Sequence, residues 1–272
     1  NMKKYHEFLI EILMLEARLT QSGQFKKIVE AIKDIVTDIN FDCNSNGISV
    51  QAIDASHVSL VSLVLRSEGF ESYQCDNPIS LGINLSSLYK ILKCSSSEDS
   101  ITISCGDDPE SLSITFESQE KDRSSQFHLR LIQIDPEQLG IPDTEYNATI
   151  CLTSVEYRRI CTDMSTLGDT MDIAVSKEGL KFEIDGDIGK GSITLHQPLK
   201  ETSIDENIKL GISEPVKMTF ALRHLNSFAK ATPLSDKIII RMSKDVPLQL
   251  HFKIYNLGFI RYYLAPKENE SN

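Results

Sequence analysis

The sequence predicts an α+β protein in which two similar domains each combine antiparallel sheets with two helices. Three observations lead to this fold class. Alternation of apolar and polar residues with period two, typical of strands with one buried face, recurs along most of the chain. Only four short segments show the 3.6-residue period of an amphipathic helix. Two of them precede residue 131 and two follow residue 147, which indicates an internal repeat of one strand–helix–strand arrangement.

The first half of the chain contains two predicted helices among several strands. Residues 24–36 carry one apolar stripe, and residues 85–93 carry another directly after Asn84, a residue type suited to cap a helix. The predicted strands, each with apolar residues at alternate positions, are 58–66, 101–105, 112–116 and 127–134.

The second half repeats this pattern. Helices are predicted at 154–164, with a capping serine at its start, and at 221–230. Gly186, Gly189 and Gly191 predict the turn of a hairpin. They do not form a phosphate-binding loop, because the order GKGS differs from GK[ST] and a strand follows. The predicted strands are 171–175, 180–184, 192–195, 237–242, 248–255 and 259–264.

Composition places the chain among ordinary globular proteins. It has 272 residues, 40% apolar and 25% charged, which excludes a collagen-like, disordered or disulfide-scaffold chain. The length fits two domains. No apolar run reaches the roughly 18 residues of a membrane helix, and Glu7 and Glu11 interrupt what would be the core of a signal peptide. We expect an intracellular protein in which residues 1–13 are an extension or an added remnant ahead of Met14.

The cysteines do not predict a metal site. They form no CxxC pair and have no histidine at ligand spacing. Apolar flanking residues favour buried, reduced thiols instead. The six are Cys43, Cys75, Cys94, Cys105, Cys151 and Cys161.

An acidic connector is predicted between the two halves. Residues 131–157 contain no Lys or Arg, and Pro136 and Pro142 exclude a continuing helix or central strand. For Leu139 and Ile141 two interpretations remain open, namely packing on their own domain or contact with a partner. The predicted organisation is an N-terminal domain, a connector, a C-terminal domain and a tail, at 14–130, 131–147, 148–267 and 268–272.

Charge is segregated along the sequence. The chain has 28 basic and 39 acidic residues, a net charge of 28 − 39 = −11. The four predicted helices carry nine basic and four acidic residues, or +5, which leaves −16 for the rest. Helices gathered on one face would offer phosphates a basic surface inside an acidic protein. The alternative is that these side chains are the solvated outer faces of amphipathic helices.

Six sequence strings now point to one family. The chain resembles the proliferating cell nuclear antigen family, the sliding DNA clamps of eukaryotes, from residue 14 to residue 267. The strings are LEARL at 15–19, DASHVSLV at 54–61, LRSEGF at 65–70, QLGIP at 138–142, KATPL at 230–234 and YYLAPK at 262–267.

The resemblance implies the DNA clamp fold and a nuclear protein that has no cofactor. Three copies would form a homotrimeric ring, with the helices lining the central hole and the sheets outside. The ring would encircle double-stranded DNA without sequence preference, be opened by a clamp loader, and act in replication, repair and translesion synthesis. The replicative polymerase, flap endonuclease, ligase and repair factors would bind through the PIP box, a short motif that inserts one aliphatic and two aromatic side chains.

The resemblance also assigns the DNA-facing residues. Two positions depart from the family pattern, because Thr162 and Thr166 replace basic or imidazole side chains of the animal proteins. We therefore expect weaker phosphate contacts from the third helix. The residues carried over are Lys26, Lys27, Lys33, Lys90, Lys93, Arg123, Arg130, Arg159, Arg223 and Lys230.

A groove for the PIP-box peptide is implied beside the connector. Ile53 replaces the methionine of animal proteins, a change of similar volume. The matching groove residues are Ile53, His57, Val58, Leu139, Ile141, Pro142, Tyr146, Pro247, Ala265, Pro266 and Lys267.

Three further features follow from the resemblance. Lys177 matches the acceptor of ubiquitin and SUMO, although from sequence alone it is an ordinary surface lysine in a turn. His224 replaces a tyrosine of the animal proteins, so regulation through that hydroxyl does not carry over. Subunits would pair edge strands near 123–131 and 192–196, which would close a continuous outer sheet.

Three other functions were weighed against the clamp. An enzyme built on Asp54, Ser56 and His57 is disfavoured, because side chains that alternate along one strand do not form a triad. A subunit of a heterotrimeric checkpoint clamp is disfavoured by the intact QLGIP and YYLAPK strings. A scaffold that never surrounds DNA would differ from the clamp in a test of polymerase processivity.

Overall fold

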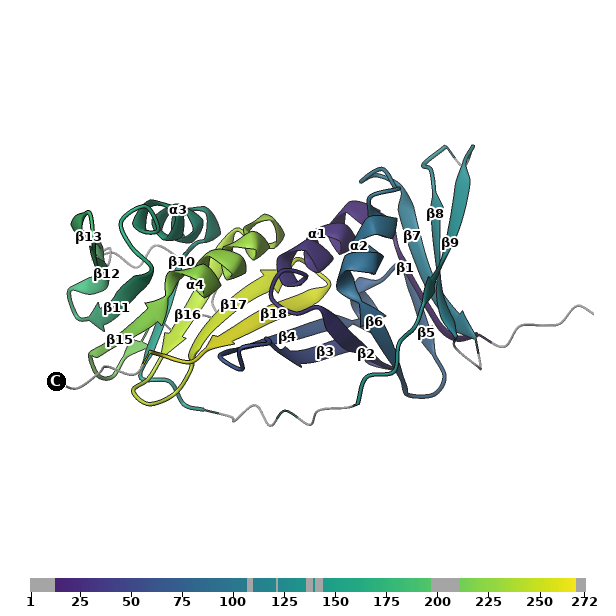
Figure 1. Cartoon of the computed structure of the whole chain (residues 1–272). Helices are drawn as coiled ribbons and strands as arrows, with labels where there is room; N and C mark the ends of the chain where they lie inside the picture. Colours follow the sequence, from purple (N-terminus) through teal and green to yellow (C-terminus); the bar gives the residue numbers. More distant parts are fainter. Residues whose placement is uncertain are drawn as a thin grey trace, which may run out of the picture.

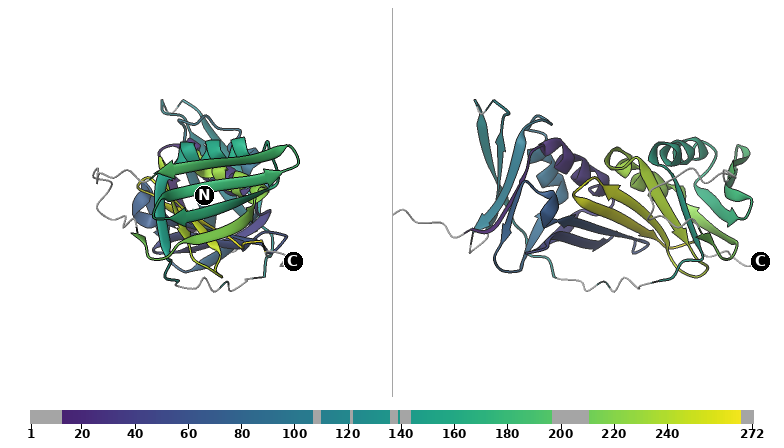
Figure 2. Two further views of the ribbon diagram at one scale, coloured as in Figure 1. Left: turned by 90° about the vertical axis from the view of Figure 1, so that its left-hand side faces the viewer. Right: turned by 180° about the vertical axis from the view of Figure 1, so that it is seen from behind.

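The computed structural model confirms an α+β architecture. The described residues form four α-helices, which lie in a row on one side of a long antiparallel sheet, with a smaller sheet at each end (Figures 1 and 2). The structure describes residues 13–106, 110–120, 122–135, 139, 144–196 and 211–267. Residues 1–12 of the predicted extension 1–13 and the whole predicted tail 268–272 lie outside these ranges.

Both halves use the same order of elements. The first half contains β1 (Leu13–Leu19), α1 (Ser22–Ile32), β2 (Asp38–Asn44), β3 (Gly47–Ile53), β4 (Ser59–Arg66), the 3₁₀ turn η1 (Ser67–Gly69), β5 (Ser72–Cys75), β6 (Ile79–Asn84), α2 (Leu85–Leu92), β7 (Ser100–Gly106), β8 (Ser111–Glu117) and β9 (Ser124–Arg130). The second half contains β10 (Ala148–Thr153), α3 (Ser154–Met164), β11 (Thr170–Ser176), β12 (Gly179–Gly186), β13 (Gly189–His196), β14 (Gly211–Ile212), β15 (Val216–Ala221), α4 (Leu222–Phe228), the 3₁₀ helix η2 (Ala229–Leu234), β16 (Lys237–Met242), β17 (Leu248–Ile254) and β18 (Gly258–Leu264).

The sheet order shows how the repeat is assembled. The central sheet has the order β14-β10-β16-β17-β18-β4-β3-β2-β6, so five strands of the second half continue into four strands of the first. One end sheet has the order β5-β1-β7-β8-β9, and its strands correspond in turn to the five second-half strands of the central sheet, β14-β10-β16-β17-β18. The other end sheet has the order β13-β12-β11-β15, and its strands correspond in turn to the four first-half strands, β4-β3-β2-β6. The junction between the halves is the antiparallel pair β4–β18, which is in register from Ser59↔Leu264 to Leu65↔Gly258. In the end sheets the equivalent strands, β9 and β13, are free edges of the described chain.

One hydrophobic core runs through both halves and under the helices. Tyr262 of β18 is fully buried, stacks on Phe228 of α4 with ring centroids 4.6 Å apart, and donates a hydrogen bond to the carbonyl of Ala31 in α1 at 3.1 Å. The Tyr157 hydroxyl of α3 similarly donates to the Leu225 carbonyl of α4 at 3.0 Å. Burial of these large side chains holds the helix row on the sheet.

Helix ends differ from the prediction at three places. The predicted helix 24–36 begins at Ser22 and ends at Ile32, because the next residues form turns. The predicted helix 221–230 is α-helical only to Phe228 and then continues as the 3₁₀ helix η2, which contains Pro233. The cap of α3 is Thr153, whose hydroxyl accepts the Glu156 N–H at 3.3 Å, and not Ser154. The predicted cap Asn84 is confirmed, since its side chain accepts the Ser87 N–H at 2.9 Å.

Strand prediction missed several elements. The first half also contains β1, β2, β3, β5 and β6, and the second contains β10, β14 and β15. The predicted strand 127–134 ends at Arg130, where the chain leaves the sheet edge. Residues 187 and 188 form the β12–β13 turn between Gly186 and Gly189, whereas Gly191 lies within β13.

The cysteine prediction is partly wrong. Cys43, Cys75, Cys105 and Cys161 are buried, and Cys151 is half-buried. Cys94 is exposed, because it follows the last turn of α2 and faces away from the core.

Candidate functional site

The helix row gathers most of the predicted DNA-facing residues. Eight of the ten lie on α1 to α4, on their C-terminal caps or on η2, and all eight are at least partly exposed. Arg123 and Arg130 are separate from this group. Arg123 directly precedes the edge strand β9 and Arg130 is its last residue, so the two lie about 23 Å apart by strand rise.

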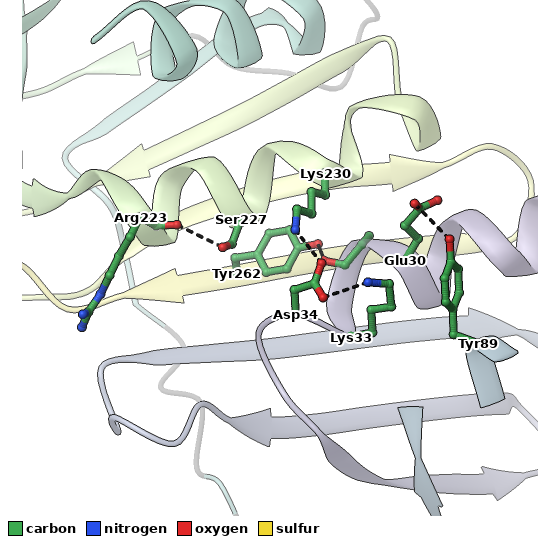
Figure 3. A network of polar contacts seen from close by, with 9 residues as sticks. Glu30, Lys33, Asp34, Tyr89, Arg223, Ser227, Lys230 and Tyr262 are labelled. Atoms are coloured by element: carbon green, nitrogen blue, oxygen red, sulfur yellow. Dashed lines mark hydrogen bonds and ion pairs between the residues drawn. The ribbon is translucent and has the colours of Figure 1, made fainter. Parts of the chain in front are cut away.

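Acidic partners neutralise part of this surface. Asp34 pairs with both Lys33, at 2.8 Å, and Lys230, so it ties the end of α1 to η2 across the two halves (Figure 3). Burial of Asp34 opposes ionisation, but the hydrogen bonds from the two lysines lower its pKa. Arg159 lies 3.6 Å from Asp163, one turn along α3.

The remaining lysines form a positive cluster on α1 and α2. Within the described residues Lys26, Lys27, Lys90 and Lys93 have no ion pair with an acidic side chain. The ammonium of Lys93 lies 5.2 Å from the ring centroid of Tyr89, a cation–π contact that leaves its charge available. Arg158 of α3 and Arg223 of α4 also have no ion pair among the described residues, so the first half holds the larger share of unpaired positive charge and not all of it.

The helices of the second half are less basic in effect. The hydroxyls of Thr162 and Thr166 donate to carbonyls of their own helix end, at 2.9 and 2.7 Å, so they are already engaged. A pocket of about 420 Å³ lies here between α1, α3, α4 and η2. Its lining mixes both charges and comprises Glu30, Asp34, Arg158, Thr162, Asn226, Ala229, Lys230 and Pro233.

Several of the predicted groove residues lie close together where β18 ends, beside the β3–β4 turn. Ala265 donates its N–H to the Val58 carbonyl at 3.0 Å, which places the chain after β18 beside the β3–β4 turn. Lys267 then donates to the Thr219 carbonyl of β15 at 2.8 Å. The segment 265–267 is therefore fixed next to Ile53 and His57 without being part of a strand.

Asp54 shapes the turn that carries His57 and Val58. Its carboxylate accepts the N–H groups of Ser56, Val58 and Ser59 at 3.2, 2.9 and 2.6 Å, as well as the Ser56 hydroxyl. Burial opposes ionisation of Asp54, but these hydrogen bonds lower its pKa to about 2. His57 is exposed and has a left-handed backbone with φ of 56°. The Asp54 carboxylate is thus engaged in building the turn.

Register places two residues, Leu60 and Tyr263, beside the predicted groove residue Ile53, and sequence reasoning did not single them out. Ile53 of β3 pairs with Leu60 of β4, and Leu60 pairs with Tyr263 of β18. All three point to the side of the sheet opposite the helices, because the neighbouring Tyr262 points into the helix row. Alternation along the YYLAPK string is the signal that could have identified Tyr263.

The connector side of the groove is described in part. Leu139 and Tyr146 are half-buried and Pro247 is exposed, whereas Ile141 and Pro142 lie outside the described residues. The start of the connector is held on the sheet edge, where the Ile132 N–H donates to the Gly82 carbonyl at 3.0 Å. A Cβ at Gly82 would lie 1.9 Å from the Ile132 oxygen, so glycine is needed for this close approach.

Three other predictions concern a modification site, a membrane span and a metal site. Lys177 is exposed in the two-residue turn between β11 and β12. In the part of the chain that the structure describes, no helix is long and apolar enough to cross a membrane. Within those ranges, no three His, Cys, Asp or Glu side chains are grouped to hold a metal ion.

Comparison with known proteins decides the family. Residues 14–138 match the family model described as proliferating cell nuclear antigen, N-terminal domain, and residues 140–267 match its C-terminal domain. The chain belongs to the proliferating cell nuclear antigen family. The proliferating cell nuclear antigen of Chaetomium thermophilum is 48% identical over 254 residues, which cover 93% of this chain and 98% of the relative.

Membership of the proliferating cell nuclear antigen family makes this chain a sliding clamp that acts in DNA replication and repair. The helix row and the row of Ile53, Leu60 and Tyr263 lie on opposite sides of the central sheet.

Proposed function

We propose that three copies of this chain close into a ring. The observation that carries the proposal is the repeat itself. β18 joins β4 within the chain, and the equivalent strands β9 and β13 are unpaired sheet edges in the described ranges. If β9 of one copy pairs with β13 of the next, the two end sheets join into a second sheet with the order of the central one. Such head-to-tail contacts form a ring when the rotation closes.

Solution mass tests ring closure. Three copies of 30.5 kDa give about 90 kDa, which light scattering across a dilution series would detect. A mass near one copy at every concentration would contradict the proposal. Replacing Thr194 of β13 with lysine on an exposed edge position should lower the trimer fraction, whereas a ring held elsewhere would be unaffected.

The helix row would line the hole and contact duplex DNA. Lys26, Lys27, Lys90 and Lys93 support this part, because they offer charge to phosphates without acidic partners. Contacts of this kind are weak, screened by salt and independent of sequence, so they permit sliding while the closed ring prevents escape.

Charge reversal tests the DNA-facing assignment. The double variant Lys26→Glu and Lys90→Glu should reduce loading or polymerase processivity on primed circular DNA without loss of the trimer. Lys253→Glu on the opposite side of the sheet is the matched control and should behave as wild type. Equal behaviour of both variants would contradict the assignment.

The groove would recruit polymerases, flap endonuclease, ligase and repair factors through PIP-box peptides in the nucleus, after a clamp loader has placed the ring on DNA. The apolar row of Ile53, Leu60 and Tyr263 beside segment 265–267 supports this role. Ile53→Glu should remove PIP-box binding in a peptide titration, and Gln51→Glu, one register row away, should not. Retained affinity in Ile53→Glu would exclude this groove.

Lys177 is proposed as a modification site for ubiquitin or SUMO. Its exposure at a hairpin tip supports the assignment, because an acceptor lysine must enter the active site of a conjugating enzyme. Lys177→Arg should remove the conjugate in a reconstituted reaction, and Lys181→Arg, in the neighbouring strand, should not.

A further inference from the structure

Basic side chains gather on the outer side of the central sheet. Arg241 of β16, His251 and Lys253 of β17, and Arg261 of β18 all point away from the helices. Arg241 lies opposite Gln249, and His251 lies opposite Arg261. A basic patch is unexpected in a protein with a net charge of −11.

Within the part of the chain that the structure describes, the hydrogen-bond and ring contacts of the two arginines are all with neutral groups. Arg241 donates from Nη1 to the Gln249 side-chain oxygen, and Gln249 donates in turn to the Tyr263 hydroxyl at 3.2 Å. Arg261 donates from Nε to His251 Nδ1 at 3.0 Å and places its guanidinium 4.3 Å from the ring centroid of Phe259. Neither arginine forms an ion pair with a carboxylate of the described residues.

Partial burial leaves this positive charge poorly compensated. Burial and the charge of Arg261 both lower the pKa of Arg241. Burial, Arg261 and Arg241 together hold the pKa of His251 at about 3, so His251 stays neutral and accepts from Arg261. A half-buried guanidinium with neutral partners only gains the most from an added anion, because such pairs are screened less than exposed ones.

The patch adjoins the groove. Register continues the row of Ile53, Leu60 and Tyr263 through Gln249 to Arg241. Arg241 and Tyr146 of the connector are close enough for the two groups to affect each other's pKa. Arg241 therefore stands at one end of the apolar row, beside the connector.

We propose that Arg241, reinforced by Arg261, forms a subsite that binds an acidic side chain flanking the PIP-box motif of a groove-bound peptide. The inference rests on the peptide groove proposed above. A peptide is favoured over DNA because the patch lies on the side of the sheet away from the helix row. It is favoured over the neighbouring connector acid Glu145, because Glu145 is exposed and has no ion pair with Arg241.

Matched peptides test the subsite. Labelled PIP-box peptides with three neutral residues on both flanks are compared with peptides carrying three glutamates on either the N-terminal or the C-terminal flank. Wild-type chain should bind one acidic peptide about five- to tenfold more tightly than the neutral peptide at low salt, and the difference should shrink as salt rises. Arg241→Gln should reduce the preference to less than about twofold, with the affinity of the same variant for the neutral peptide as the reference.

Two further variants complete the cycle. Lys253→Gln removes one positive charge from the same face at a distance from the groove and should retain the preference, whereas Arg241→Lys should retain part of it. A preference that survives Arg241→Gln would overturn the proposal. Equal binding of all peptides by the wild-type chain would also overturn the proposal. Occupation of the subsite by acidic residues of the connector would give this result. Failure of every peptide to bind would instead refute the groove itself.

Discussion

Replacing Asp54 with asparagine should destabilise the protein through loss of one charge. Asp54 is 7% exposed as a residue, and its carboxylate accepts three backbone N–H groups and one hydroxyl in the β3–β4 turn. Asparagine keeps the shape but presents one neutral oxygen and an N–H₂ group. The N–H₂ group would face backbone donors, which leaves part of the turn unsatisfied.

The size of the effect follows from the pKa of Asp54. Hydrogen bonds lower it from 3.8 to about 2 against the opposing effect of burial. At about 1.4 kcal/mol per pKa unit, the ionised form contributes about 2 kcal/mol to the free energy of unfolding. Because the folded pKa is depressed, this contribution is fully present above pH 4 to 5 and is lost as the pH falls toward 2.

Chemical denaturation of wild type and Asp54→Asn between pH 7 and pH 3 measures this term. We expect a difference of about 2 kcal/mol at pH 7 that narrows as the pH falls below 4. Asp245→Asn, in another exposed turn with positive φ, is the control for loss of a turn carboxylate and should change stability by less than about 0.5 kcal/mol. A gap for Asp54→Asn that stays constant with pH would refute the electrostatic reasoning. The variant should also weaken peptide binding, since the same turn presents His57 and Val58.

Two further variants probe the junction between the halves. Asp34→Asn frees Lys33 and Lys230 for phosphates, so the slope of log affinity against log salt for duplex DNA should steepen by up to about 1.8. An unchanged slope would mean that these lysines do not reach DNA. Gly258→Ala would place a Cβ 1.8 Å from the carbonyl oxygen of Val64 in the β4–β18 pair and should lower stability by about 3 kcal/mol in thermal or chemical unfolding. A decrease in stability of less than about 1 kcal/mol would show that the backbone of the β4–β18 pair shifts locally to admit the Cβ.

Local patterns were sufficient for much of the fold. The helix Ser154–Met164 and the strand Lys237–Met242 have the predicted bounds, because an apolar stripe or strict alternation starts and stops there. Short strands such as Gly211–Ile212 carry too few residues to show a period. The pairing of β4 with β18 was equally out of reach, because register between distant strands leaves no local signal.

The candidate site shows the same division between local and distant information. Lys26, Lys27, Lys90 and Lys93 were assigned from the family resemblance, and the structure places them on α1, on α2 and at the end of α2. The ion pair between Lys230 and Asp34 could not be predicted from the sequence, because the two residues lie 196 positions apart in the chain. Leu60 and Tyr263 were missed because only the sheet register places them beside Ile53.

The two halves of the chain have the same fold but differ in the charge that their helices carry. Both halves place two helices on the same side of equivalent sheets, so any charge on those helices faces the same space. The first half leaves four lysines unpaired there, whereas in the second half Arg159 meets Asp163 and two threonine hydroxyls turn back on α3. In the proposed ring this difference recurs three times, which gives alternating more basic and less basic arcs around the hole. A duplex inside would be attracted most strongly to the three more basic arcs, by contacts that salt screens. That distribution suits a protein whose hold on DNA depends on topology.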